Sequence, residues 1–137
     1  MNYQRILLGG LLGGVVFNAF SMVINIVGLG ARYEILQKQD VFRVEPRLPF
    51  LPLWLLMIFA VSVGLVWLYA AARKQLGPGP KTAIMVGLAV GLIAGLPHPM
   101  AGYAWSYQGG FVSLMQAIEF IAGCTLATVA GGWLYKE

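Results

Sequence analysis

Four apolar runs, each long enough to cross a lipid bilayer, constrain this chain more than any other feature of its sequence. A membrane-spanning helix takes about 20 apolar residues, and the runs cover residues 6–31, 48–72, 82–105 and 111–135. Only short polar or charged segments separate them. The sequence therefore predicts an all-α integral membrane protein, a four-helix bundle formed by one transmembrane domain over residues 1–137.

The composition agrees with lipid as the solvent of this chain. Hydrophobic residues make up 59% of it and charged residues only 10%, whereas soluble domains carry about 25% charged residues. The net charge is +4, but the Lys and Arg residues flank the apolar runs, where they set topology and contact lipid phosphates. We therefore expect membrane lipids and no nucleic acid among the partners.

Sequence motifs for enzymatic chemistry are missing, so we predict that the protein is not an enzyme. The segment 77–82 looks like a phosphate-binding loop, but Pro80 stands where that loop needs a glycine before Lys81. It is more typical of a rigid turn in which Thr82 caps the third helix. One His and one Cys in the whole chain cannot supply the three or four ligands of a zinc site, so no metal is expected.

The basic residues of the short loops favour one orientation in the membrane. A cytoplasmic N-terminus puts Arg5, Arg73, Lys74, Lys81 and Lys136 inside, against four basic residues in the first loop. Because cytoplasmic loops carry the excess of Lys and Arg, we predict that both termini are cytoplasmic. The first loop, residues 32–47, alternates charged and apolar residues, which is typical of an amphipathic interfacial segment or of a docking surface.

The second and fourth runs end on similar sequences, Trp-Leu-Tyr followed by a basic residue. Aromatic rings with a polar edge prefer the headgroup level of the bilayer, so we predict interface anchors at Trp67, Tyr69, Trp133 and Tyr135. Both endings should then lie at one membrane face. The likeness also suggests that the bundle is built from two similar helical hairpins.

Small residues line the predicted helices at four-residue spacing. Such stripes let backbones approach closely, which is a main source of helix association in lipid. They provide either packing within this bundle or a seam for another subunit. The glycines concerned are Gly9, Gly10, Gly13, Gly14, Gly87, Gly91, Gly95 and Gly123.

One acidic residue, Glu119, lies inside a predicted helix, about 12 Å from its start. Ionisable residues at such depth are expensive and are often functional. Gln116 shares its helix face, and Asn18, Ser21 and Asn25 form a polar stripe on the first helix. One interpretation is a proton or cation site between these two faces. The other is a hydrogen bond that only holds the two helices together.

The only histidine, His98, lies between Pro97 and Pro99, which should break or kink the third helix after Leu96. Its aromatic neighbours favour a place near the membrane interface. A histidine there would suit ligation of haem or chlorophyll, or a hydrogen bond at the interface. The sequence itself requires no cofactor.

Short motifs along most of the chain resemble those of a group of small four-helix bacterial membrane proteins with no assigned activity. The resemblance rests on Arg5 with Leu8-Gly9-Gly10, on Asn18, on residues 77–83, on Glu119 and on residues 132–137. It implies a bacterial inner membrane and four helices. Small multidrug transporters are similar in size and helix count, but their essential acid lies in the first helix, where this chain has Asn18 and Asn25.

Three functions follow as hypotheses. The first is a non-enzymatic membrane subunit or scaffold that packs through its glycine faces into a homo-oligomer or a larger membrane complex. The second is a small proton- or cation-coupled transporter or channel that uses Glu119. The third is a subunit that holds haem or chlorophyll through His98 in an electron-transfer or photosynthetic complex.

Overall fold

The computed structural model describes residues 1–135 and is helical through most of its length, with no strand among them. Four helical stretches have the length and hydropathy to cross a membrane, which confirms the predicted all-α membrane bundle. The chain is thus a multi-pass membrane protein. The elements are α1 (Tyr3–Met22), the π-helical turn η1 (Val23–Gly28), α2 (Gly30–Lys38), α3 (Phe50–Leu76), α4 (Pro80–Gly95), α5 (Pro97–Trp105) and α6 (Gly110–Leu134).

The first span begins earlier and ends sooner than the predicted 6–31. Its start is Tyr3, because the Asn2 side chain caps the helix by accepting a hydrogen bond from the Arg5 N–H at 3.1 Å. Its end is the π-turn, after which α2 begins a separate short helix. The predicted interfacial loop 32–47 is therefore helical in its first part.

The turn between α3 and α4 forms without the predicted cap. Gly77 and Gly79 both have positive φ, 83° and 139°, which side chains rarely adopt. Pro80 opens α4 at its first position, and Gly79 is the cap residue. Thr82 was predicted to cap the helix, but its hydroxyl donates back to the carbonyl of Gly77 at 2.8 Å, because Pro80 moves the helix start two residues upstream.

The third span is interrupted where the two prolines predicted it. α4 ends at Gly95 and α5 begins at Pro97, with Leu96 between them. The Leu96 N–H still bonds the Leu92 carbonyl at 3.2 Å, so the chain bends and continues across the membrane. The interruption follows from the missing donor and the ring of each proline.

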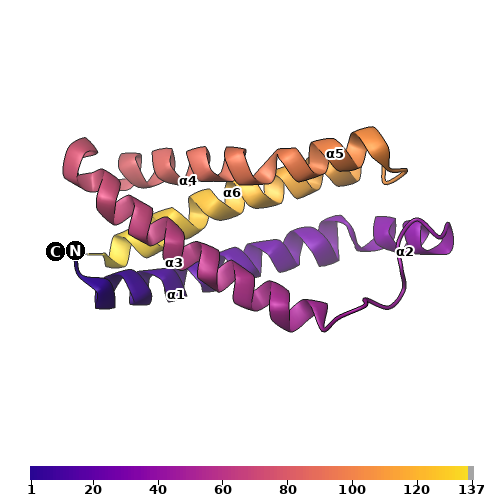
Figure 1. The fold of residues 1–137 in the computed structure, drawn as a ribbon, viewed down its shortest axis with the longest axis horizontal. Helices are drawn as coiled ribbons and strands as arrows, with labels where there is room; N and C mark the ends of the chain where they lie inside the picture. Colours follow the sequence, from indigo (N-terminus) through magenta and orange to yellow (C-terminus); the bar gives the residue numbers. More distant parts are fainter. Residues whose placement is uncertain (136–137) are drawn as a thin grey trace.

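Helix α6 lies at the centre of the arrangement. It packs against α1 and α4, which do not pack closely on each other, and α3 crosses beside α1 (Figure 1). The two ends of the described chain and the α3–α4 turn lie at one end of the bundle, while α2 and the α5–α6 connection lie at the other (Figure 1). The predicted common face of the two Trp-Leu-Tyr endings is thereby confirmed.

The glycine stripes lie between helices of this one chain. A methyl group at Gly9 or Gly13 would stand 2.5 or 2.6 Å from a carbonyl oxygen of α6. Gly10 lies against the backbone and side chain of Val63 of α3, and Gly14 lies against the Phe59 ring of α3. Side chains have no room there, so these helices approach to backbone contact. The remaining contacts of this kind join Gly87, Gly91 and Gly95 to α6 and Gly123 to Phe17.

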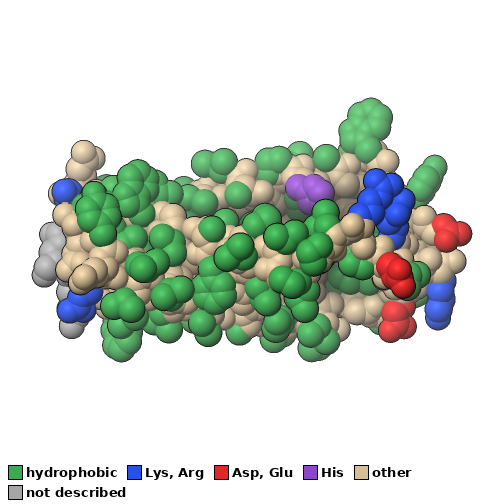
Figure 2. All heavy atoms as spheres, turned by 60° about the horizontal axis from the view of Figure 1, so that its bottom comes forward, with side chains coloured by type: hydrophobic (Ala, Val, Ile, Leu, Met, Phe, Trp, Pro, Cys, Tyr) green, Lys and Arg blue, Asp and Glu red, His purple; other side chains and the backbone are tan. Residues whose placement is uncertain are grey.

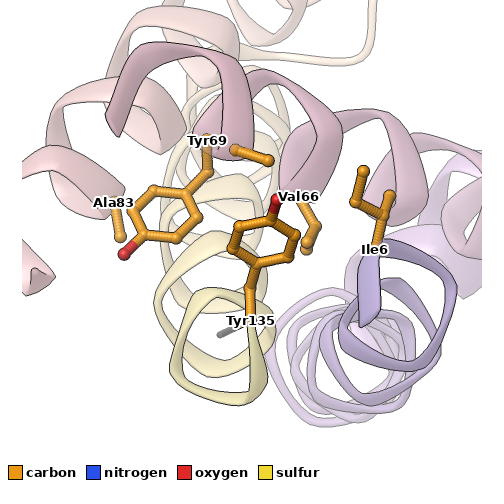
Figure 3. Packing of buried hydrophobic residues seen from close by; sticks show 6 residues of the cluster. Ile6, Val66, Tyr69, Ala83 and Tyr135 are labelled. Atoms are coloured by element: carbon orange, nitrogen blue, oxygen red, sulfur yellow. The ribbon is translucent and has the colours of Figure 1, made fainter. Parts of the chain in front are cut away.

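Two tyrosines predicted as interface anchors are buried instead. Tyr69 is 4% exposed and Tyr135 is 3% exposed, and their rings meet edge to face with centroids 6.3 Å apart (Figure 3). The Tyr69 hydroxyl accepts the Gly79 N–H at 3.2 Å. The Arg73 guanidinium lies 5.1 Å from the Tyr135 ring centroid. Both tyrosines therefore join helix ends within the protein, because these turns offer partners that the sequence pattern does not show.

The outer surface matches a bilayer environment. Figure 2 shows hydrophobic side chains over the middle of the visible face and charged side chains at its two ends, with the acidic ones at the α2 end. Trp67 and Trp133, the other two predicted anchors, are 48% and 78% exposed. Lipid is the solvent that such a belt requires.

Candidate functional site

Glu119 lies on α6, nine residues after Gly110, which corresponds to about 13 Å of helix rise. It faces the end of α1 and is only 3% exposed. The glycine contacts of Gly9 and Gly13 with α6 hold the two helices together further along the same seam. Close helix packing therefore sets the position of this carboxyl group.

Two neutral donors converge on one oxygen of Glu119. The Ser21 hydroxyl donates a short hydrogen bond to Oε1, and the Asn25 amide Nδ2 donates to the same atom at 2.9 Å. The sequence prediction that Ser21, Asn25 and Glu119 lie together across two helices is therefore correct in its geometry. We call Glu119, Ser21, Asn25, Trp54 and Tyr33 the Glu119 cluster.

The π-helical turn belongs to this site. Asn25 lies inside η1, where the Leu29 N–H bonds the Ile24 carbonyl at 2.9 Å, a five-residue step. The Asn25 amide also donates to the Ser21 backbone carbonyl at 2.9 Å, so its side chain competes with the regular helical bond. Single π-turns inside α-helices occur often at functional sites.

Trp54 and Tyr33 complete the cluster, and the sequence analysis missed both. The Trp54 indole N–H donates to the Ser21 hydroxyl oxygen at 3.2 Å. The Tyr33 hydroxyl donates to the Asn25 carbonyl oxygen Oδ1 at 3.0 Å. Trp54 arrives on α3 and Tyr33 on α2, and only the fold brings these elements over the end of α1. The one sequence signal for Trp54 and Tyr33 was that each is an aromatic residue with a polar edge.

Burial raises the pKa of the Tyr33 hydroxyl above its ordinary value, and the charge of Glu119 raises it further. A hydrogen bond with Gln116 acts in the opposite direction. Tyr33 therefore remains a hydroxyl donor at neutral pH. Its ring packs among apolar residues at the α2 end and lies 5.7 Å from the ring of Phe42. Helix α2 therefore covers the Glu119 cluster on that side.

Asn18 and Gln116, also predicted at the site, make no hydrogen bond to Glu119 within the described residues. The Asn18 amide donates to the Gly14 carbonyl at 3.0 Å, and its Oδ1 is buried without a partner. The Gln116 oxygen Oε1 is likewise buried and unpaired. These two acceptor atoms lie one helical turn from Ser21 and Glu119 and are free to bind a donor or a cation.

Glu119 has no charged partner in the part of the chain that is described. The partners of Glu119 there are a hydroxyl and an amide, with no Lys, Arg or His paired to it. Over residues 1–135, no group of three His, Cys, Asp or Glu side chains forms a metal centre. A buried carboxylate without a counter-charge favours binding of a proton or a cation.

His98 lies away from this site, exposed on α5 between Pro97 and the buried Pro99. Figure 2 shows it at the surface, among hydrophobic side chains. A haem or chlorophyll ligated there would have to lie on the outer face of the bundle, so cofactor ligation by His98 stays a prediction.

Comparison with known proteins found no relative of this chain. No family model matches the sequence, and no curated protein and no solved structure matches it either. The resemblance to small bacterial membrane proteins stays a prediction.

Proposed function

We propose that this protein binds and releases a proton or a small cation at Glu119 and acts as a small proton- or cation-coupled transporter or channel. The observation that carries this proposal is a carboxyl group 3% exposed inside a membrane span, with neutral donors as its partners. Such a group gains most from a ligand that brings positive charge.

The surrounding atoms support the same function. The Ser21 hydroxyl oxygen contacts the carboxyl group, and the Asn25 oxygen lies further out against the Tyr33 hydroxyl. Gln116 adds a buried oxygen that has no partner. Oxygen donors suit protons and hard cations. The site is also near the α2 end, where Tyr33 connects Asn25 to the membrane boundary. This arrangement supports entry from that end.

Ion flux into liposomes tests the proposal. We expect the wild-type protein to raise proton, Na⁺ or K⁺ flux above that of empty liposomes, and Glu119→Gln to lower it at least tenfold, because the amide keeps the shape and loses the charge. Internal ion-sensitive dyes measure the flux. Glu34→Gln, which removes an exposed acid of α2, is the matched control and should keep wild-type flux.

Two results would contradict this function. One is equal flux in the Glu119→Gln variant and the wild type. The other is wild-type flux no greater than that of empty liposomes for all three cations. Circular dichroism of each variant establishes that the bundle is folded before flux is compared.

We infer a bacterial inner membrane with both termini cytoplasmic. The end of the bundle with the N-terminus carries Arg5, Arg73, Lys74 and Lys81, without an acidic residue among those described. The opposite end mixes basic residues with Glu34, Asp40 and Glu45. The excess of positive charge at the first end supports its cytoplasmic placement.

A second proposal is association of two copies through α3. The glycines predicted to hold another subunit contact helices of the same chain instead, but Ala60 and Gly64 remain open on α3. A side chain at Gly64 would meet nothing within 4 Å. Two small residues four positions apart on a largely exposed span form the kind of surface through which identical helices pair.

Native mass spectrometry in mild detergent tests this association. We expect a dimer of the wild-type protein and a mainly monomeric Gly64→Leu variant, because leucine separates the two backbones. Ala94→Leu enlarges an exposed small residue of α4 and should leave the dimer unchanged. Equal dimer fractions in Gly64→Leu and the wild type would exclude pairing through this face.

A further inference from the structure

A groove of about 320 Å³ lies on the outside of the bundle between α5 and α6. We call it the α5–α6 groove. Its walls are almost entirely apolar, formed by residues such as Leu96, Pro99, Met100, Leu114 and Ala117. Two wall residues, Tyr103 and Ser113, carry a hydroxyl group. That of Ser113 is already used, since it accepts the Gln108 amide at 2.8 Å and lies 3.2 Å from the Gly109 carbonyl.

The groove results from a change in how the third span packs. Gly87, Gly91 and Gly95 hold α4 at backbone distance from α6. The stripe ends at Gly95, and Pro97 bends the chain, so α5 leaves the surface of α6. Further along, the Tyr103 ring returns to α6, where a methyl group at Gly110 would stand 3.3 Å from it. The groove is the space between these two contacts.

Both walls belong to membrane spans, Pro80–Trp105 and Gly110–Leu134. Met100 is 65% exposed and Leu114 is 55% exposed, so the groove opens outward to the solvent of these helices. In a bilayer, that solvent is acyl chain, and an apolar hollow in the spanning surface is filled by it.

One end of the groove lies at the expected headgroup level. Trp105, the last residue of α5, and Tyr107, just beyond it, are each 91% exposed, and aromatic rings with a polar edge are enriched at that level. A lipid seated with its chain in the groove would therefore carry its headgroup near the α5–α6 connection.

A cation without an acidic partner lies at the same end. The Arg32 guanidinium carbon is 5.8 Å from the ring centroid of Phe111, the residue that follows Gly110 of the groove wall. Arg32 is exposed, and no carboxylate pairs with it among residues 1–135. Guanidinium groups bind phosphate oxygens through two parallel hydrogen bonds. A phosphate at this level therefore meets complementary charge.

We propose that the α5–α6 groove binds one acyl chain of an anionic phospholipid whose headgroup pairs with Arg32. The site is separate from the Glu119 cluster, so it stands whether or not Glu119 carries ions. It uses an apolar cavity for the chain and one unpaired cation for the headgroup. The charge selects the anionic lipid, because neutral lipids fill the groove equally well.

Lipid retention measures this binding. The protein is reconstituted in vesicles of equal parts phosphatidylglycerol and phosphatidylcholine, extracted into mild detergent and weighed by native mass spectrometry. We expect one retained phosphatidylglycerol, favoured about tenfold over phosphatidylcholine. Arg32→Gln should abolish the preference, and Lys38→Gln, at another exposed cation of α2, should preserve it.

A separate variant tests the part of the site that binds the acyl chain. Ala117→Phe fills the groove and should lower retention of both lipids, whereas Leu126→Phe changes an exposed apolar residue elsewhere on α6 and should not. Equal retention of the two lipids by the wild type would overturn the proposal. An unchanged preference in Arg32→Gln, a surface substitution that leaves the core intact, would overturn it as well.

Discussion

Replacing Gly13 by leucine is expected to lower the free energy of unfolding by about 3 kcal/mol or more, at or above the upper end of the range for overpacked cores. A methyl group at Gly13 would stand 2.6 Å from the Ala127 carbonyl oxygen of α6. The obstacle is backbone, so no rotamer change relieves it. Helices α1 and α6 would have to separate along their whole seam. Unfolding in mixed micelles with rising dodecyl sulfate, followed by circular dichroism, measures the loss.

Gly64→Leu provides the matched control for this substitution. It places the same side chain in a membrane span, at a glycine where nothing lies within 4 Å. Measured at a concentration where the protein is monomeric, it should change stability by less than about 1 kcal/mol, as surface substitutions usually do. Equal stability of Gly13→Leu and Gly64→Leu would mean that α1 and α6 are not in backbone contact.

The second large effect is expected from the double variant Ser21→Ala with Asn25→Ala. It removes both donors to Glu119 Oε1 and leaves the carboxyl group buried without a partner. Hydrogen bonds between membrane helices contribute about 0.6–1.7 kcal/mol each, and an unpaired buried acceptor adds about 1–3 kcal/mol. The same unfolding titration should therefore report a loss of about 2–6 kcal/mol.

A third substitution tests whether the stability lost in the double variant comes from the unpaired carboxyl group or from the removal of side-chain packing. Adding Glu119→Leu to the double variant eliminates the unpaired carboxyl group, and we expect it to restore at least half of the lost stability. Removing a buried polar group together with its partners is often nearly neutral. Absence of any restoration would show that Ser21 and Asn25 stabilise the bundle without reference to Glu119.

The number of spans, their class and the break after Leu96 could be predicted because each depends on local sequence. A long apolar run indicates a membrane span, and a proline indicates a break in a helix. The helix starts were less accurate, because caps such as Asn2 lie outside the apolar pattern. Thr82 shows the same limit, since Pro80 decides where α4 begins.

The core of the site could be found from spacing, but its surroundings could not. Ser21 and Asn25 share a face of the first predicted helix, and Glu119 is the lone acid within a predicted helix, so the helical spacing predicted that they would lie together. Tyr33 and Trp54 reach the cluster through the turn after η1 and the crossing of α3. Those are tertiary features. Tyr69 and Tyr135 illustrate the reverse error, since their partners exist only after the helix ends meet.

The central place of α6 has a consequence for how the protein is made. Ribosomes synthesise α1, α3 and α4 before α6, and each of these three helices contacts α6. Until it inserts, Gly9 and Gly13 of α1 and the glycine stripe of α4 have no partner, and Ser21 and Asn25 have no carboxyl group to bind. The earlier spans are therefore incompletely packed in the membrane until α6 inserts. Insertion of α6 closes both seams and assembles the Glu119 cluster in one event.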